Sequence, residues 1–171
     1  LGLGGRHQLE NAAIAIAVAE SLSIPRDIII TGLKTAHHPG RLELIASEPP
    51  VLLDGAHNPA GAQALREYLY EFGRRPLTIV FAAMRDKQLD RIGEILFPLA
   101  DHLLLTAIDN PRAASLETLS AIATRFAGGP VTKCSTVTDA FHAALSQTPP
   151  PGLICVTGSL YLIGEWKQQH E

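Results

Sequence analysis

The residues of this chain that could do chemistry follow short apolar runs. Asp54 ends the run Val51-Leu52-Leu53, and His57 follows in a glycine-containing turn before a helical pattern begins. A carboxylate at the end of a strand can accept two hydrogen bonds from a ribose diol, and a nearby histidine can meet a nucleotide or a developing charge. The alternative role for Asp54 is to cap the helix that begins near Pro59, because aspartate is a preferred capping residue.

Polar residues follow later apolar runs in the same way, in the segments Arg85-Asp86-Lys87, Asp109-Asn110-Pro111-Arg112 and Thr157-Gly158-Ser159. The carboxyl ends of parallel strands meet at one rim of a sheet, so these segments are expected to form a ligand site there with Asp54 and His57. Ser159 and nearby backbone N–H groups suit a carboxylate or phosphate, although Ser159 could equally be an ordinary helix cap. The adjacent charges at 85–87 could also be a solvated cluster.

An apolar run, a turn and a helical stretch recur from residue 51 onward, and this cadence predicts parallel βαβ units. After the strand that begins at Val51, strands are expected at 78–84, 102–107, 131–134 and 153–157, and helices at 60–72, 89–99, 115–127, 139–147 and 159–168. Alternating residues at 42–46 predict an antiparallel edge strand. The predicted fold is α/β and Rossmann-like, with flanking helices on a mostly parallel sheet of about six strands.

Two helices are predicted ahead of this fold. Residues 9–22 carry alanine, isoleucine and valine on most faces, which indicates a largely buried helix, and Pro25 opens a shorter helix that His37-His38 end. Asn11, in the first turn of the first helix, is either a capping or solvated amide or a hydrogen-bond partner for a base or phosphate. Neighbouring histidines on a helix point about 100° apart, so that pair does not predict a metal site.

The composition of the chain argues against several classes of function. With 171 residues, of which 46% are hydrophobic, the chain can bury a real core. Its net charge of -3 and scattered basic residues argue against a nucleic-acid partner. Cys134 and Cys155 lie in apolar runs, which favours buried thiols over zinc ligands. No apolar run approaches the roughly 20 residues of a membrane helix and no leader is evident, so a cytoplasmic protein without a membrane partner is expected.

Four segments, in chain order, resemble folylpolyglutamate synthase and dihydrofolate synthase of the Mur ligase superfamily. They are GRHQLENAAIAIA at 5–17, PGRLE with VLLDGAHNPAGAQAL within 39–65, VFAAMRDKQLD at 80–90 and VTGSLYLIGEW at 156–166. The resemblance implies that residues 1–38 are a helical segment from the end of a central ATPase domain and that 39–171 are the carboxyl-terminal Rossmann-like domain. Leu1 is not an initiator methionine, so a longer parent protein is expected.

The family resemblance also implies an activity. Such enzymes use ATP and Mg²⁺ to convert a carboxylate of folate or dihydropteroate into an acyl phosphate, which the amine of L-glutamate attacks. Asn11, Arg41 and Asp54 match the family's nucleotide contacts, with Arg41 on the phosphates and Asp54 on the ribose hydroxyls. His57 would lie at the catalytic position where nucleotide and glutamate meet. By looser analogy with other Mur-type ligases, Ser159 and Lys87 would bind the glutamate carboxylate.

The family's phosphate loop, magnesium ligands and most of its folate pocket are expected upstream, so this part alone should be inactive. Two alternatives stay open at this point, namely another Mur-type amide ligase domain and a non-catalytic Rossmann-like module that binds a nucleotide or a partner. A nicotinamide-dependent dehydrogenase does not fit, because DGAHNPAG has one glycine too few for the dinucleotide fingerprint. The sequence leaves open whether the parent accepts dihydropteroate, folylpolyglutamates or both.

Overall fold

The computed structural model describes residues 4, 5 and 7–168. Two helices come first, α1 (His7–Ser21) and α2 (Arg26–Thr35). The strands are β1 (Glu43–Ile45), β2 (Val51–Asp54), β3 (Leu77–Phe81), β4 (His102–Thr106), β5 (Val131–Cys134) and β6 (Leu153–Thr157). The other helices are α3 (Pro59–Phe72), α4 (Leu89–Leu96), the 3₁₀ turn η1 (Phe97–Leu99), α5 (Leu116–Phe126), α6 (Val137–Gln147) and α7 (Leu160–Lys167).

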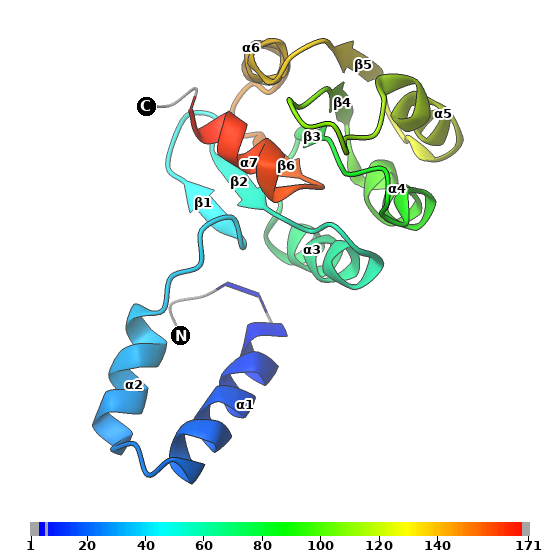
Figure 1. Cartoon of the computed structure of the whole chain (residues 1–171). Helices are drawn as coiled ribbons and strands as arrows, with labels where there is room; N and C mark the ends of the chain where they lie inside the picture. Colours follow the sequence, from blue (N-terminus) through cyan, green and yellow to red (C-terminus); the bar gives the residue numbers. More distant parts are fainter. Residues whose placement is uncertain (1–3, 6, 169–171) are drawn as a thin grey trace.

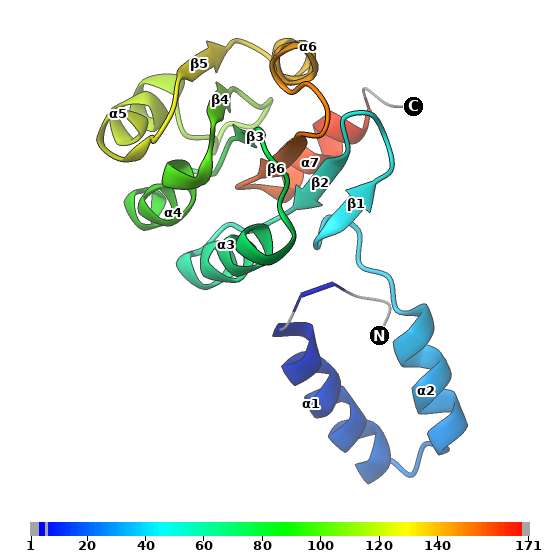
Figure 2. The same ribbon diagram turned by 180° about the vertical axis from the view of Figure 1, so that it is seen from behind.

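The strands form one six-stranded sheet in the order β1-β2-β6-β3-β4-β5. Only β1 is antiparallel to its neighbour, and the other pairs are parallel. Helices α3, α4 and α5 cover one face, and α6 and α7 cover the other (Figures 1 and 2). The predicted α/β fold with one antiparallel edge strand is confirmed.

The central strands are buried on both faces, which explains their continuous apolar runs. Every residue of β3 and β6 is buried. Successive side chains point to opposite faces, so Leu52 joins the core beneath α3, α4 and α5, whereas Leu53 joins the core beneath α6 and α7. Cys134 and Cys155 are buried free thiols, as predicted, and burial raises the pKa of the Cys155 thiol so that it stays protonated.

Most predicted limits differ from the structure by one or two residues, but two predicted elements end three residues earlier than expected. Strand β3 stops at Phe81 instead of Met84, because the chain after it leaves the sheet and pairs with the loop after β4. Met84 forms an antiparallel bridge with Ala113, and the Ala114 N–H donates to the Ala83 carbonyl at 2.9 Å. The helix expected at 89–99 changes to a 3₁₀ turn at Phe97, where the following proline cannot supply a helical N–H.

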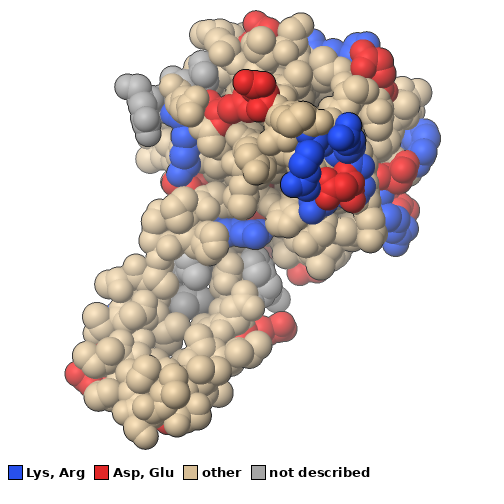
Figure 3. Space-filling model, viewed as in Figure 1, with Lys and Arg blue, Asp and Glu red and all other residues tan. Residues whose placement is uncertain are grey.

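Helices α1 and α2 lie side by side and project from the α/β part of the chain (Figure 1). The predicted burial of the first helix is not seen, because Leu9, Ile14 and Leu22 are 63%, 65% and 69% exposed. Helix α2 has no buried residue, and the visible face of the pair is largely uncharged (Figure 3). The pair therefore leaves large apolar side chains exposed, among them Leu9, Ile14, Val18 and Ile28, which no other described element covers.

None of the described helices combines the length and the apolar character that crossing a lipid bilayer requires.

Candidate functional site

The carboxyl ends of the central strands lie level with one another. Asp54 of β2 is opposite Thr157 of β6, and Thr157 is opposite Phe81 of β3. The polar segments that follow these strands therefore leave the sheet at one rim, which is the place where open α/β sheets bind ligands.

The turn at residues 39–43, PGRLE, is fixed to this rim by its backbone and by Glu43. Gly40 has a φ of +70°, and a Cβ there would lie 3.2 Å from side-chain atoms of Leu160 and Ile163. The Gly40 carbonyl accepts the Gly55 N–H at 2.7 Å, which joins the turn to the end of β2. Glu43 accepts the Gly40 N–H at 2.7 Å and the Lys167 ammonium at 2.7 and 2.8 Å.

Asp54 holds the same turn from the other side. Its Oδ2 accepts the Leu42 N–H and its Oδ1 accepts the Ala56 N–H, both at 2.9 Å, and the residue is only 6% exposed. The capping alternative for Asp54 is wrong, because Asn58 is the N-cap of α3 and accepts the Gly61 N–H at 2.8 Å. The carboxylate thus joins residues 40–43 to the end of the strand.

The side chain of Arg41, unlike that of Glu43, takes no part in the contacts that hold the turn. Within the described part of the chain, its guanidinium has no hydrogen bond or ion pair, and it is partly exposed. It lines a shallow cavity of about 220 Å³ together with His37, His38 and Glu43. A planar cation on a fixed backbone is well suited to a phosphate group.

A second cavity, of about 180 Å³, brings together three residues predicted for the site. His57 follows β2, Lys87 follows β3 and Ser159 follows β6, and all three line this cavity. Arg112 lines it as well. The sequence placed Arg112 on the rim but gave no reason to select it, because its position depends on the pairing of the loops after β3 and β4.

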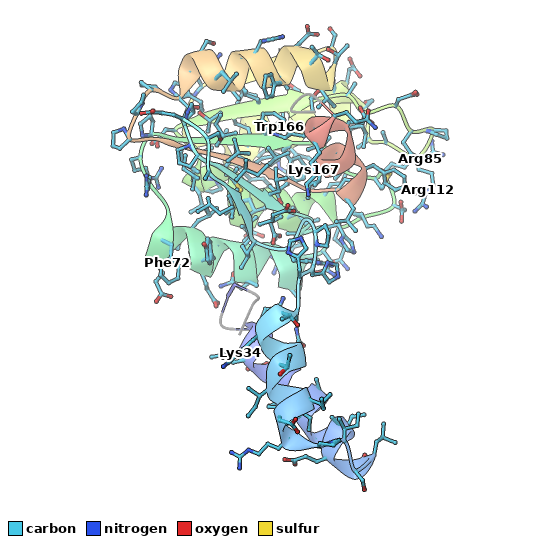
Figure 4. The ribbon with its side chains drawn as sticks, turned by 90° about the vertical axis from the view of Figure 1, so that its left-hand side faces the viewer. Lys34, Phe72, Arg85, Arg112, Trp166 and Lys167 are labelled. Carbon is cyan, nitrogen blue, oxygen red and sulfur yellow. The ribbon has the colours of Figure 1, made fainter. Side chains whose placement is uncertain are left out.

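The cations of this cavity are organised around Asp86. The Arg112 Nη2 donates to both Asp86 carboxylate oxygens, at 3.1 and 3.2 Å, and the Lys87 ammonium lies 3.5 Å from Asp86. The hydrogen bond from Arg112 is the main reason why the pKa of Asp86 lies below its usual value. Arg85 and Arg112 lie together at the rim (Figure 4), where the Arg85 N–H donates to the Arg112 carbonyl at 2.9 Å. Because Arg112 and Lys87 carry two positive charges and Asp86 carries one negative charge, this group has a net positive charge beside the cavity.

Backbone contacts orient the two remaining polar groups. His57 Nδ1 lies 2.7 Å from the Gly55 carbonyl, which can only accept, so Nδ1 carries the hydrogen and Nε2 is left for a ligand. Ser159 is the N-cap of α7 and accepts the Tyr161 N–H at 3.1 Å, so the capping interpretation is confirmed. Its hydroxyl can still donate one hydrogen bond. Gly158 before it has a φ of +102°, and a Cβ there would meet the Ala82 carbonyl at 2.5 Å.

Asn11 lies apart from both cavities, on α1. Its side chain is exposed and donates to the Gln8 side-chain oxygen at 3.0 Å, so within the described residues the amide binds a neighbour on its own helix. It is not among the residues that line the Arg41 cavity or the His57 cavity.

Glu43 makes the turn sensitive to acid. Partial burial raises the pKa of Glu43, but hydrogen bonds from Lys167 and the Gly40 N–H outweigh burial, so the pKa lies below its reference value of 4.5. The unfolded chain therefore binds a proton more readily, and stability from this contact is present above pH 4.5 and is lost as the pH falls through the folded-state pKa. We expect Glu43→Gln to reduce the acid-dependent fall in thermal midpoint between about pH 5 and 3. Equal slopes for both proteins would contradict this role.

Comparison with known proteins matches residues 40–160 to the family model "Mur ligase, glutamate ligase domain". A probable bifunctional folylpolyglutamate synthase/dihydropteroate synthase of Halobacterium salinarum is 36% identical over 162 residues, which cover 94% of this chain and 20% of that protein. A dihydrofolate synthase/folylpolyglutamate synthase of Mycobacterium tuberculosis is 37% identical over 155 residues, which cover 85% of this chain and 32% of that protein.

A solved structure of Mycobacterium tuberculosis folylpolyglutamate synthase complexed with ADP superimposes with a TM-score of 0.92. It is 33% identical and covers 99% of this chain and 41% of the solved one. The chain thus spans between a fifth and a third of the length of these two curated relatives. Because the family model matches well over half of the residues, this chain belongs to the Mur ligase family, in its glutamate ligase domain.

Proposed function

We propose that this chain is the carboxyl-terminal part of an ATP-dependent ligase that adds L-glutamate to folate or dihydropteroate through an acyl phosphate. The observation that carries the proposal is the arrangement of the rim, where Arg41, a cation that has no hydrogen-bond or ion-pair partner for its side chain among the described residues, is held on a fixed turn. From that turn the chain continues through β2 to His57, which lines the cavity shared by Lys87 and Ser159. One rim thereby offers a place for a nucleotide and a place for an amino acid.

The nucleotide side consists of Asn11, Arg41 and Asp54 in this proposal. Arg41 would contact the phosphates, because a guanidinium can donate two parallel hydrogen bonds to phosphate oxygens. Asn11 would reach the nucleotide from the projecting helix pair. The related structure from Mycobacterium tuberculosis is complexed with ADP, which supports ATP as the ligand.

The glutamate side is the His57 cavity. Lys87 and Arg112 would supply positive charge for a glutamate carboxylate, and the Ser159 hydroxyl would donate one hydrogen bond to it. Because His57 Nδ1 is bound to the Gly55 carbonyl, Nε2 could accept a hydrogen bond from the incoming amine. This would place the amine where nucleotide and amino acid meet.

The rest of the site would come from elsewhere in the parent protein. We propose that residues 1–38 end a central ATPase domain and that 39–171 form the carboxyl-terminal domain. The uncovered apolar surface of α1 and α2 supports this division, because such a surface usually packs on a partner. Among the described residues no group of three or more His, Cys, Asp or Glu side chains suits a metal, so the Mg²⁺ that accompanies ATP would be held upstream.

The 171-residue chain alone should therefore not ligate glutamate, since positioning of the γ-phosphate and metal needs the missing groups. We expect no ADP release above background with ATP, Mg²⁺, L-glutamate and either dihydropteroate or a folate. The full-length parent, assayed with both acceptors, is the control and also tells which acceptor it uses. Turnover by the chain alone would contradict the proposed division of the site, and a parent inactive with both acceptors would refute the proposed reaction.

A further inference from the structure

The side chain of Lys167, the last residue of α7, is bound to the turn that carries Arg41. Its ammonium donates to both carboxylate oxygens of Glu43, at 2.7 and 2.8 Å, and joins residues that are 124 positions apart. The two side chains are 32% and 20% exposed, whereas each of the other described ion pairs includes a side chain that is at least 47% exposed. Water therefore screens this pair less than it screens the others.

Helix α7 holds Lys167 at a fixed place beside the turn. Figure 4 shows Lys167 next to Trp166, which is buried and whose ring lies 5.1 Å from the ring of Phe141 on α6. At the other end of the helix the turn packs directly on α7, because a Cβ on Gly40 would lie 3.2 Å from the Leu160 side chain. The ammonium is therefore carried by an element that is packed both on the fold and on the turn.

The Glu43 carboxylate lines the same cavity as Arg41. Its pKa lies below the reference value of 4.5, so the carboxylate is charged at neutral pH. A bare negative charge in this cavity would oppose a phosphate in two ways, because it would repel the anion and would compete with it for the Arg41 guanidinium. Lys167 binds both oxygens of this carboxylate and supplies the compensating positive charge.

We propose that Lys167 is a positioning residue for the nucleotide subsite, which holds and neutralises the Glu43 carboxylate so that Arg41 stays available for a phosphate. This inference rests on the proposed function, in which Arg41 contacts the phosphates. It gives the last residue of α7 an effect on phosphate binding that depends on the charge of Glu43. Once Glu43 is made neutral, Lys167 should no longer be needed.

The test uses inorganic tripolyphosphate, a polyanion that offers only phosphate groups. Its binding to the 171-residue chain is measured by NMR titration at constant pH and low ionic strength, where screening is weakest. We expect Arg41→Ala to weaken binding about tenfold or more, because a charge-assisted contact is lost. Lys167→Met keeps a long side chain but removes the charge, so it should weaken binding severalfold.

A second substitution should reverse the effect of Lys167→Met. Glu43→Gln alone should bind tripolyphosphate at least as tightly as the unchanged protein, since the glutamine oxygen can still accept the Gly40 N–H and the negative charge is gone. The double variant of Lys167→Met and Glu43→Gln should recover most of the lost affinity. A loss of stability could not explain this recovery, because the double variant lacks the same ion pair. Lys167→Arg keeps the charge and should bind like the unchanged protein.

Lys133→Met is the matched control for the loss of one positive charge. Lys133 is an exposed residue of β5, which forms the opposite edge of the sheet from β1. This variant should leave tripolyphosphate affinity unchanged. An equal loss in Lys133→Met and Lys167→Met would show a general effect of net charge and would overturn the inference.

The outcomes separate this inference from the proposed function. If the unchanged chain does not bind tripolyphosphate, or if Arg41→Ala binds it equally well, the phosphate role of Arg41 is refuted and the inference fails with it. If Arg41→Ala weakens binding but Lys167→Met does not, the proposed function stands and the role of Lys167 is overturned. The same holds if Lys167→Met weakens binding and Glu43→Gln does not restore it, because the effect would then not arise from the Glu43 charge.

Discussion

Arg41→Ala in the proposed full-length ligase is expected to raise the Michaelis constant for ATP about ten- to a hundredfold, which corresponds to one charge-assisted hydrogen-bonding contact. The thermal midpoint should change little, because the guanidinium has no internal partner among the described residues. The loss should exceed that of Arg41→Lys, which keeps the charge but lacks the planar fork. Steady-state kinetics with varied ATP, together with thermal unfolding, measure both quantities.

The matched control for Arg41 is Arg74→Ala. Arg74 is an exposed arginine near Pro150 and Pro151, which precede the amino end of β6. The substitution Arg74→Ala therefore removes the same charge, but at the opposite end of the strands from Arg41. It should leave the ATP constant unchanged. An equal rise in both variants would indicate a general effect of net charge and would argue against a phosphate contact by Arg41.

Lys87→Ala is expected to raise the Michaelis constant for L-glutamate about tenfold or more, since it removes one cation from the cavity of His57 and Ser159. Arg112 would remain but would then be the single cation beside Asp86, so the cavity would lose its positive balance. The ion pair with Asp86 is exposed, so its loss should scarcely alter stability. Kinetics with varied L-glutamate at saturating ATP provide the measurement.

Arg85→Ala is the control for this second variant. Arg85 lies two residues earlier in the same loop but does not line the His57 cavity. It should keep a normal constant for L-glutamate. If Lys87→Ala behaves like Arg85→Ala, Lys87 belongs to a solvated charge cluster and the glutamate assignment fails.

The fold was predictable because its signal is local. Strands β2, β3 and β6 are buried along their whole length and therefore read as mostly apolar runs, and each is followed by a turn and a helix. Strands β5 and β6 have the predicted limits, and the single antiparallel edge strand was expected from the alternation near residue 44. The rim was predictable for the same reason, because it follows from strand direction alone.

The roles of individual rim residues depend on contacts between distant parts of the chain. Asp54 looked like a ligand or a cap, and it is bound to the N–H of Leu42, twelve residues earlier. Arg112 reaches Asp86 across 26 residues, because two loops pair outside the sheet. No local propensity encodes either contact, so the sequence could indicate where the site lies but not which groups hold it together.

For the first helix, the sequence predicted burial that the described chain does not show. Its apolar faces predicted burial, and in the described chain they are exposed, because α2 covers too little of α1. The apolar pattern of this helix indicates a surface that packs against another part of a larger protein. Under our proposal, that part is the rest of the ATPase domain.

The most direct test of the account is to measure both Michaelis constants, for ATP and for L-glutamate, on both Arg41→Ala and Lys87→Ala in the full-length parent. The account assigns the turn at residues 39–43 to the nucleotide and the cavity of His57, Lys87 and Ser159 to the amino acid. It predicts a crossed result, in which Arg41→Ala raises only the ATP constant and Lys87→Ala raises only the glutamate constant. If both variants alter the same constant, or neither alters any, the assignment of two subsites to this rim is contradicted.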